Sequence, residues 1–467
     1  MNEQTKLKAA VLGASGYTGA ETVRLLAGHP RVDAVAATGN SLAGKALSEI
    51  FPHLAGPTDL PVVKAEDVDW TGIDVAFGCL PHGTSQDLIE TLPDHVRVVD
   101  LSADYRLRDA NLYAETYGRA HLNPARTAVV KYGLPEWRGD SLRGEALVAC
   151  PGCYPTASLL ALLPVVNLID PDSVIIDAKS GVSGSGRGLK EGNLFSEAAE
   201  GSLAYGVGQH RHAPEIEQEL NSQAGRNDIG VTFTPHLLPM VRGELVTCHV
   251  RGDADQIQTA LEAKNANAPF ITVLPAGSKA PDTKHVRGTN NCRIAVYPDR
   301  VQGRVVIVAV IDNLVKGSSG QAIQNLNLMM AEDQAVWREL WTGYLEFYES
   351  KVSDEVYEST FQRLLTDGPY EPSGLIAWEG DEALGLVHFM FHRHCWRVEN
   401  VCYLQDLFAR PAARGKGVGR ALIEAVYAHA DQSGCPVVYW NTADDNATAR
   451  QLYDRIAHKT QFIKYLR

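Results

Sequence analysis

Residues 7–26 read LKAAVLGASGYTGAETVRLL, and this stretch decides the fold expected for the first part of the chain. An apolar strand over residues 7–12 runs through a glycine turn into a helix with apolar periodicity. This order is typical of a dinucleotide-binding α/β fold, because glycines let the backbone approach a pyrophosphate and the helix N-terminus offers it free N–H groups. The residues predicted to bind the cofactor here are Gly13, Ser15, Gly16, Tyr17, Thr18 and Gly19.

The end of the second predicted strand indicates which dinucleotide binds. Residues 32–37 form this strand, and a fold that prefers NAD places an acidic residue after it for the ribose 2′-hydroxyl. Here the chain continues as TGNS over residues 38–41, without an acidic residue. Ser41 and Lys45 are therefore predicted to meet the 2′-phosphate of NADPH, with a solvated loop as the alternative interpretation.

Two further predicted strands, residues 73–77 and 96–100, each end in a loop of small and polar residues. Open parallel sheets bind their ligands at the carboxyl ends of the strands. Ser102 and Arg106 follow the later strand and are predicted to bind substrate, with Arg106 pairing a carboxylate or phosphate. The alternative for Arg106 is a surface salt bridge.

Residues 149–157 read ACPGCYPTA and lie between an apolar strand and an apolar helix. Pro151 and Gly152 predict a tight turn that places Cys153 at the start of the helix. Free N–H groups there stabilise a thiolate and a neighbouring oxyanion, which is the setting of a nucleophilic thiol. Two alternatives stay open: a buried structural cysteine, and a redox pair with Cys150.

The second half of this region adds candidate anion-binding and proton-transfer groups. A glycine- and serine-rich loop over residues 180–188 offers backbone N–H groups to an anion, and we predict substrate contacts from Ser183, Gly184 and Arg187; a surface loop without a ligand is the alternative. Residues 210–212 read HRH, so that one imidazole can move a proton beside Cys153. Apolar runs over residues 231–239, 243–250 and 304–311 predict a mixed sheet.

The five motifs, taken in order, closely resemble the N-acetyl-γ-glutamyl-phosphate reductase family over residues 6–329. They are GASGYTG at 13–19, LSADYR at 101–106, PGCYPT at 151–156, HRHAPEI at 210–216 and DNLVKG at 312–317. The resemblance implies that Cys153 accepts the acyl group, that His210 is the acid/base with His212 beside the substrate, and that NADPH donates hydride. Asn313 is expected near the nicotinamide.

This resemblance implies the reduction of N-acetylglutamyl phosphate to N-acetylglutamate semialdehyde and phosphate through a thioester, a step of arginine biosynthesis. Related semialdehyde dehydrogenases, such as aspartate-semialdehyde dehydrogenase, remain as alternatives. A regulator that senses NADPH with a redox thiol is a second alternative, and it requires pairing of Cys150 with Cys153.

The chain changes character after residue 330. An amphipathic pattern over residues 334–348, two strand-like runs, RPAARGKGVGR at 410–420 and NATARQLYD at 446–454 resemble the GNAT superfamily of acetyltransferases over residues 331–467. This resemblance implies acetyl-CoA bound at Leu407, Arg414, Gly415, Gly417, Gly419, Arg420 and Asn446, with Tyr453 as proton donor. Asp406 is either a general base or a satisfied strand-end carboxylate. The segment is accordingly either an active N-acetyltransferase or a structural, weakly active module.

Length and composition limit the number of domains, the kinds of partner and the compartment that we expect. The 467 residues suffice for about three domains by the usual length prior, and 45% hydrophobic with 21% charged residues is ordinary for a soluble protein. A net charge of −13 argues against nucleic-acid and anionic-membrane partners. Eight cysteines without framework spacing and a start without a signal-peptide core favour a cytoplasmic protein. We expect a homo-oligomer acting on a small molecule, without a metal.

The expected architecture is α/β throughout. Residues 1–149 with 312–330 are predicted to form a Rossmann-type NADP-binding domain, and residues 150–311 an α+β catalytic domain of the semialdehyde-dehydrogenase type. Residues 331–467 are predicted to form a GNAT-like α/β domain.

Overall fold

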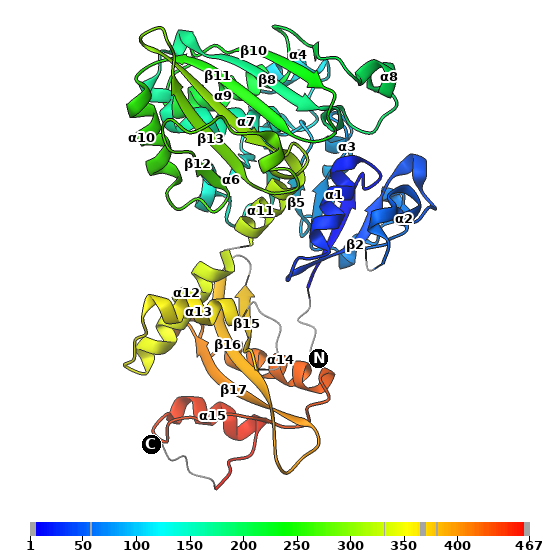
Figure 1. The fold of residues 1–467 in the computed structure, drawn as a ribbon. Coiled ribbons are helices and arrows are strands. Elements are labelled where there is room, and N and C mark those ends of the chain that lie inside the picture. Colours follow the sequence, from blue (N-terminus) through cyan, green and yellow to red (C-terminus); the bar gives the residue numbers. More distant parts are fainter. Residues whose placement is uncertain (1–5, 57, 331, 365–369, 380–381, 462–467) are drawn as a thin grey trace. The chain divides into compact units, whose positions relative to one another are not determined.

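The computed structural model describes residues 6–56, 58–330, 332–364, 370–379 and 382–461 (Figure 1). Residues 6–330 form one compact unit, and the described residues from 332 onward belong to a second. The mixed α/β class expected from the sequence is confirmed. In the part of the chain that is described, no helix is long and apolar enough to cross a membrane.

The first layer of residues 6–330 is a seven-stranded sheet in which every pairing is parallel, with strand order β3-β2-β1-β4-β5-β7-β6. Its strands are β1 (Leu7–Leu12), β2 (Val32–Thr38), β3 (Val62–Val63), β4 (Val75–Gly78), β5 (Arg97–Asp100), β6 (Lys131–Tyr132) and β7 (Leu147–Ala149). The runs of apolar residues in these strands are buried because helices cover a parallel sheet on both faces. The order β2-β1-β4 places the loop after β1 at the point where strand order reverses, the usual position of a dinucleotide site.

Helices α1 (Tyr17–Leu26) and α11 (Gly320–Met329) share one apolar core with this sheet. Val23 and Leu26 of α1 are fully buried in it with Val11 of β1, and Leu326 of α11 is buried in the same cluster. The last helix of the unit therefore packs with the first strand, although about 300 residues separate them. The other helices around this sheet are α2 (Leu47–Ile50), α3 (Ser85–Ile89), α4 (Ala110–Tyr117), α5 (Pro124–Thr127) and α6 (Pro135–Arg138).

The second layer is a mixed seven-stranded sheet with order β12-β13-β14-β11-β8-β10-β9. Its strands are β8 (Ile175–Gly181), β9 (Leu203–Ala204), β10 (Thr232–Leu238), β11 (Glu244–Arg251), β12 (Ile271–Val273), β13 (Cys292–Pro298) and β14 (Arg304–Ile311). The central strand β11 runs antiparallel to both β8 and β14. The predicted mixed sheet is therefore present, and its apolar runs form a second core.

Helix α7 (Cys153–Leu162) packs against β11 and β14, beside α9 (His212–Ala224). Every residue of α7 after Cys153 is buried, which agrees with its apolar sequence. Helix α10 (Ala254–Asn265) packs against β12 and β13, and α8 (Phe195–Ala198) is a short helix in the long segment between β8 and β9. Residues Val315–Ser319 form a π-helical turn that leads directly into α11.

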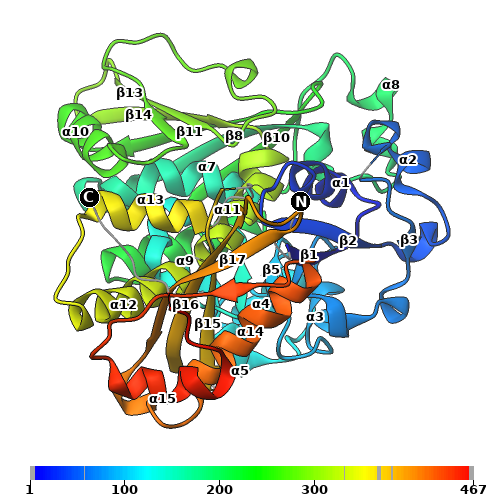
Figure 2. The same ribbon diagram turned by 90° about the horizontal axis from the view of Figure 1, so that it is seen from below.

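The second unit is built on a four-stranded sheet of order β15-β16-β17-β18: β15 (Ser373–Glu379), β16 (Glu382–Arg393), β17 (Asn400–Ala409) and β18 (Val438–Tyr439). Helices α12 (Glu332–Phe347) and α13 (Asp354–Leu364) share a core with Leu386 and Phe408. Helix α14 (Val418–Gln432) lies against β16 and β17 (Figure 2) and forms a separate core with Leu404. The last helix is α15 (Ala447–Ile456).

An irregularity in β17 explains how this strand contributes side chains to two separate cores. His388 of β16 pairs with Asp406, whereas the next residue, Phe389, pairs with Leu404, so that Gln405 is an extra residue in β17. Such a bulge switches the faces to which the following side chains point. Leu404 consequently faces the α14 core, while Phe408 faces the core formed with α12 and α13.

Candidate active site

Cys153 is the first residue of α7, at the turn between β7 and the helix, as the sequence predicts. The Gly152 N–H before it donates a 2.9 Å hydrogen bond to Glu215 Oε1, which holds the turn from the side of α9. Gly317 of the π-helical turn also lies against Cys153, because a Cβ at Gly317 would be only 2.7 Å from the Cβ of Cys153. The thiol therefore sits where α7, β11 and the π-helical turn meet.

The electrostatic setting of this thiol differs from the expectation. The N–H of Tyr154 at the helix start acts to lower the pKa of Cys153, as predicted. Burial and the carboxyl of Glu244 act in the opposite direction and are larger, so that the pKa of Cys153 lies well above its usual value. A thiol with a raised pKa forms a thiolate less readily, so a nucleophilic role for such a group requires a proton acceptor.

Glu244 is a site residue that the sequence analysis missed. It is the first residue of β11, is fully buried, and has no hydrogen-bond partner on either carboxyl oxygen among the described residues. Burial, reinforced by the charge of Asp312, raises its pKa to about 8. A charged residue inside the apolar run over residues 243–250 was the available signal, because Glu is almost never fully buried without a reason.

Arg106 lies beside the Cys153 turn and is almost completely buried. Its Nε donates to the carbonyl of Cys150 at 2.8 Å, and its Nη2 donates to the carbonyl of Leu101 at 2.9 Å. Nη1 pairs with Glu215 Oε2 at 3.3 Å and lies 2.9 Å from where a Cβ of Gly152 would be. The surface salt bridge considered for Arg106 is thus excluded, since the guanidinium is buried at the predicted nucleophile.

Glu215 connects these groups, and the sequence analysis quoted it without assigning it a role. Its Oε1 accepts from the Tyr132 hydroxyl at 2.7 Å as well as from Gly152 N–H, while Oε2 faces Arg106. Because three elements donate to one buried carboxylate, the turn before Cys153 and the Arg106 guanidinium are fixed relative to each other.

The two histidines lie together, with ring centroids 4.7 Å apart. His212 begins α9, and its Nε2 would lie 2.6 Å from a Cβ of Gly152, which places it directly at the Cys153 turn. Its buried Nδ1 has no partner among the described residues. His210 packs edge-on against Tyr154 and Tyr205. Both imidazoles have lowered pKa values, that of His210 to about 4, chiefly because they are buried.

The hydroxyl of Ser102, predicted to bind substrate, already makes two hydrogen bonds within the protein. It donates to Asp100 Oδ2 at 2.6 Å and accepts from the Asp104 N–H at 3.1 Å. Asp100 is fully buried, and burial raises its pKa to about 6. In this state Ser102 shapes the loop that carries Arg106.

The predicted residues of the loop after β8 contact two different parts of the unit. Ser183 Oγ accepts from Asn313 Nδ2 at 2.9 Å, and Asn313 Oδ1 accepts from the Gly243 N–H at 2.8 Å. A Cβ at Gly184 would lie 3.6 Å from Asn313 Nδ2, so these three predicted residues are neighbours. Arg187 instead reaches the dinucleotide loop, donating to the carbonyl of Ser15 at 3.4 Å and stacking over Phe51.

The predicted dinucleotide loop has the form that a pyrophosphate needs. Gly13 has φ of +81° and no room for a side chain, because a Cβ would lie 2.6 Å from the carbonyl oxygen of Cys79. Gly19 is equally confined, since a Cβ there would lie 2.4 Å from the carbonyl oxygen of Gly13. Gly16 caps α1 without a side-chain hydrogen bond, and the first turn has no acidic residue, so the helix N–H groups are open to an anion.

The remaining dinucleotide candidates surround this loop. The carbonyl of Thr18 accepts from Ser319 Oγ at 2.9 Å, which ties the loop to the π-helical turn. Tyr17, Ser41 and Lys45 are exposed, with the last two in and after the short turn Asn40–Leu42 that follows β2. These residues fit a dinucleotide with a 2′-phosphate. No group of three or more His, Cys, Asp or Glu side chains in the described chain is placed to hold a metal.

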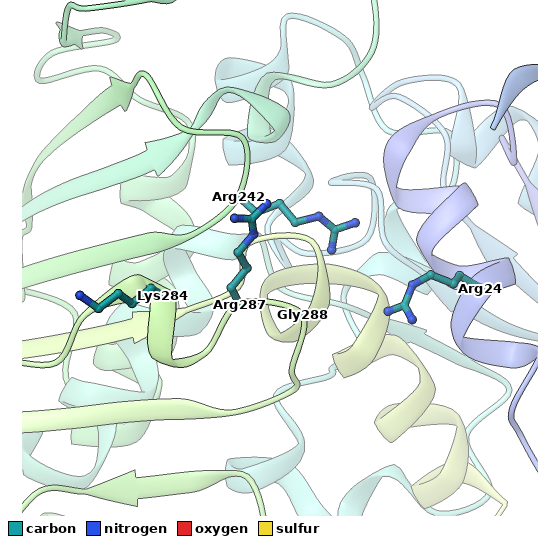
Figure 3. A pocket seen from close by; sticks show the side chains of 5 residues that line it. All are labelled: Arg24, Arg242, Lys284, Arg287 and Gly288. Atoms are coloured by element: carbon teal, nitrogen blue, oxygen red, sulfur yellow. The ribbon is translucent and has the colours of Figure 1, made fainter. Parts of the chain in front are cut away.

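A basic pocket of about 520 Å³ lies elsewhere in residues 6–330, lined by Arg24, Arg242, Lys284, Arg287 and Gly288 (Figure 3). Arg24 and Arg242 both pair with the buried Glu21, at 2.7 and 2.8 Å, and Lys284 pairs with Asp282 at 2.9 Å. The carboxylates of Glu21 and Asp282 therefore balance part of the charge of the four cationic side chains. None of these side chains belongs to the predicted site.

In the second unit, the predicted acetyl-CoA loop precedes α14. Gly417 caps α14 with φ of +90°, Gly415 has φ of +82°, and no side chain caps the helix. Arg414 donates to the carbonyl of Ala409 at 3.3 Å, while Arg420 pairs with Glu424. Leu407 is partly exposed on β17, and a Cβ at Gly419 would lie 3.5 Å from the side chain of Leu452 of α15. The loop has open N–H groups at a helix start, as pyrophosphate binding requires.

The other predicted residues of this unit lie on or near α15 and β17. Asn446 caps α15, accepting from the Ala449 N–H at 3.3 Å, and the ring of Tyr453 packs against Trp440 at 5.3 Å. Burial raises the pKa of Tyr453 to about 12. Asp406 is buried and accepts from Trp341 Nε1 at 3.2 Å and from His388 Nδ1 at 2.8 Å. These bonds favour the satisfied-carboxylate interpretation of Asp406.

Comparison with known proteins first defines the class. The semialdehyde dehydrogenase NAD-binding domain matches residues 8–144, and the semialdehyde dehydrogenase dimerisation domain matches residues 153–313. The acetyltransferase (GNAT) family matches residues 334–458, so a GNAT domain is appended at the C-terminal end. The chain thus combines a semialdehyde-dehydrogenase-type oxidoreductase with a GNAT domain.

Three relatives of known name identify the family within this class. A reductase from Rhodospirillum rubrum is 51% identical over 337 residues, covering 70% of this chain and 95% of that protein. One from Ruegeria pomeroyi is 49% identical over 331 residues, covering 70% and 96%. A probable chloroplastic protein of Arabidopsis thaliana is 47% identical, covering 69% and 82%. All three are named N-acetyl-gamma-glutamyl-phosphate reductases, and this chain belongs to that family.

Solved structures support the fold. An aspartate semialdehyde dehydrogenase II from Vibrio cholerae matches with a TM-score of 0.53 at 18% identity, covering 69% of this chain and 98% of that one. An aspartate semialdehyde dehydrogenase from Candida albicans, solved with NADP, matches with a TM-score of 0.51 at 17% identity and covers 70% and 99%. These similarities agree with the fold of residues 6–330, which contains one parallel and one mixed sheet.

Proposed function

We propose that residues 6–330 reduce N-acetyl-L-glutamyl 5-phosphate to N-acetyl-L-glutamate 5-semialdehyde and phosphate, with NADPH as reductant and Cys153 as the acyl-accepting nucleophile. One observation carries the proposal: the Cys153 turn is held by Glu215 and bordered by Arg106 and His212, all buried. Relatives at about half identity carry the name of this activity.

In the first half of the reaction, the sulfur of Cys153 attacks the acyl carbon. The C–S bond forms, the C–O bond to phosphate breaks, and phosphate leaves with the electron pair, so a thioester remains on the enzyme. A cysteine suits both halves because its thiolate attacks readily and leaves readily. In the second half, bound NADPH supplies a hydride to the thioester carbon. The resulting thiohemiacetal then releases the aldehyde and the sulfur.

Proton transfer to the developing oxyanion is assigned to His210, and contact with substrate to His212. The position of His212 Nε2 beside Gly152 supports the reverse assignment as a second candidate. Arg106 and Ser102 are proposed to border the substrate with Ser183 and Gly184. For Arg187, the contact with Ser15 supports a role on the dinucleotide side.

The cofactor is proposed to lie over the glycine loop of Gly13, Ser15, Gly16, Tyr17, Thr18 and Gly19, with its 2′-phosphate at Ser41 and Lys45. Asn313, fixed between Ser183 and Gly243, is proposed to border the nicotinamide. The NADP-binding domain would comprise residues 1–149 with 312–330, and the catalytic domain residues 150–311. Burial of Leu326 and Met329 in the core of the first sheet supports this division.

The test is an assay of the reverse reaction, in which phosphate and one aldehyde at a time are offered with NADP. Reduction of NADP with N-acetylglutamate semialdehyde is expected. Activity with aspartate semialdehyde alone would refute the substrate assignment. Replacement of Lys45 by Glu is expected to raise the KM for NADP about tenfold or more while leaving that for NAD unchanged, because it removes positive charge from the 2′-phosphate.

For the second unit we propose acetyl-CoA binding along Leu407, Arg414, Gly415, Gly417, Gly419, Arg420 and Asn446, with Tyr453 as proton donor to the leaving thiolate. The open helix start at Gly417 supports this placement. Calorimetric titration of acetyl-CoA into the intact protein is expected to show one site per chain. Absence of binding would leave the module structural.

We further propose a cytoplasmic homo-oligomer, without nucleic-acid or membrane partners. All eight cysteines are free, which agrees with a reducing compartment. The match of residues 153–313 to a dimerisation domain supports self-association. Light scattering of the purified protein measures the oligomeric state, and a monomer would refute this part of the proposal.

A further inference from the structure

The Glu244 carboxyl is a buried titratable group at the nucleophile to which the reaction as described assigns no task. Glu244 starts β11, opposite Ser180 of β8 and Ile311 of β14. The side chain of Ile311 and the Cβ of Cys153 both border Gly317, at 3.1 and 2.7 Å from where its Cβ would be. The start of β11 and the start of α7 therefore converge, and the Glu244 carboxyl and the Cys153 thiol are near enough for each to shift the pKa of the other.

The carboxyl lacks the partners that buried carboxyls normally have. Its two oxygens are buried without a hydrogen-bond partner among the described residues. Other buried glutamates of this unit are paired: Glu215 with Arg106, and Glu21 with Arg24 and Arg242. Burying a polar group without a partner is unfavourable, so an unpartnered carboxyl close to a predicted nucleophile indicates a functional reason.

We propose that Glu244 is the group that accepts the proton of the Cys153 thiol when the sulfur attacks and returns it when the sulfur is released. The inference rests on the proposed function and adds a catalytic residue to it. Because the two groups share protons, they titrate as a pair rather than as independent acids.

The proton balance is complete within the pair. In acylation the S–H bond breaks, its proton goes to a Glu244 carboxyl oxygen, and the sulfur electron pair forms the C–S bond. Phosphate leaves with the electrons of the C–O bond and takes a proton from solvent. When the thiohemiacetal collapses, the C–S bond returns its electrons to sulfur, which takes back the proton held by Glu244.

The other titratable groups near the thiol are less suited to this task. Glu244 and Arg106 shift the pKa of Cys153. The thiol in turn shifts the pKa values of Tyr154 and Tyr205. Asp312 is the further charge that acts on Glu244. Arginine and tyrosine do not accept a proton near neutral pH. Burial lowers the pKa of His210 to about 4 and lowers the pKa of His212, which lies at the Cys153 turn, well below its usual value, so both imidazoles are weak acceptors. The pKa of Glu244, about 8, is far closer to that of a thiol.

The test replaces Glu244 by Gln, which keeps the shape but accepts no proton, and measures two rates on the intact protein. Single-turnover phosphate release from N-acetylglutamyl phosphate reports acylation. Iodoacetamide alkylation of Cys153, followed by mass spectrometry across pH, reports the thiolate population. Acylation is expected to fall about 10²-fold or more. Alkylation at a given pH is expected to stay the same or rise, because the variant lacks the negative charge that opposes thiolate formation.

Two further variants complete the experiment. Glu244→Asp retains a carboxyl and is expected to recover at least about tenfold of the lost acylation rate. Glu90→Gln is the matched control, since Glu90 is a partly buried carboxyl held by Asn123 and Arg126 in the first layer, and it is expected to change neither rate.

Unchanged acylation in Glu244→Gln would overturn the proposal, and so would a parallel fall of acylation and alkylation in both Glu244 variants. If the wild-type protein releases no phosphate from the substrate, the proposed function fails instead. The pH profile of alkylation then still decides whether the two groups are coupled, since coupling predicts two titration steps in the wild type and one in Glu244→Gln.

Discussion

The surroundings of Cys153 in the first unit and of Asp406 in the second unit differ in how their buried titratable groups are paired. Around Cys153, buried atoms of Glu244 and His212 have no partner among the described residues. In the second unit, the buried Asp406 is held by His388 and Trp341, and His388 in turn accepts from Trp337 Nε1 at 2.7 Å. Groups left unpaired at a reactive atom are available to a substrate or a proton, whereas a saturated network mainly stabilises a core.

The largest effect that tests this contrast is expected from Cys153→Ser. Loss of the nucleophile should lower kcat about 10⁴-fold or more in the phosphate-dependent reduction of NADP, because a hydroxyl is a far weaker nucleophile than a thiolate. Cys150→Ser is the control. Cys150 is fully buried and accepts from Asn325, and its variant should retain activity. A comparable loss in Cys150→Ser would instead support the redox-regulator alternative.

The next effect separates the two histidines. His210→Asn and His212→Asn are each expected to lower activity, and the one that moves the proton should lose about 10²–10⁴-fold in kcat. The other should act mainly on KM. Steady-state kinetics of both variants decide the assignment, and a loss below about threefold in both would remove the histidine pair from proton transfer.

A smaller effect concerns stability against pH. Burial lowers the pKa of His210 in the folded protein to about 4, against 6.5 for an unburied imidazole. Protonation therefore favours the unfolded chain, and the contribution of His210 to stability is full above about pH 6.5 and lost as the pH falls toward 4. The stability gap between wild type and His210→Asn should narrow by about 2 kcal/mol over this range. Denaturant unfolding at pH 7 and pH 4.5 measures it, and a constant gap would contradict the burial of the ring.

The smallest effect is expected in the second unit. Trp341→Phe removes one donor from Asp406 but leaves His388, so the free energy of unfolding of this unit should fall by only about 1–2 kcal/mol. Acetyl-CoA binding should be unchanged. Thermal unfolding and calorimetric titration check both points. If Trp341→Phe abolished acetyl transfer without loss of stability, Asp406 would belong to the chemistry, and the contrast between the units would fail.

The sequence predicted much of the fold and the position of Cys153 at a helix start. Strands over residues 7–12 and 304–311 agree with β1 and β14 residue for residue, because both are apolar runs bounded by glycine or polar turns. Cys153 was placed at the start of its helix from the Pro-Gly turn between an apolar strand and an apolar helix. These features are local, so neighbouring residues suffice to predict them.

Contacts between residues far apart in the sequence could not be predicted from neighbouring residues. The raised pKa of Cys153 depends on Glu244, which is 91 positions away in the chain, and the turn before it is held by Glu215 of another helix. The contact of Arg187 with Ser15 joins a loop of the second sheet to the first strand's turn. Periodicity and motifs carry no information on such pairs.

Taken by itself, the sequence determined the α/β class, the glycine turn, the cysteine at a helix start and the junction near residue 330, since each follows from local backbone chemistry and apolar spacing. Tertiary structure alone decided which buried groups are paired and which are not. Desolvation and long-range contacts set the proton affinity of a side chain, and both exist only after distant segments have packed together.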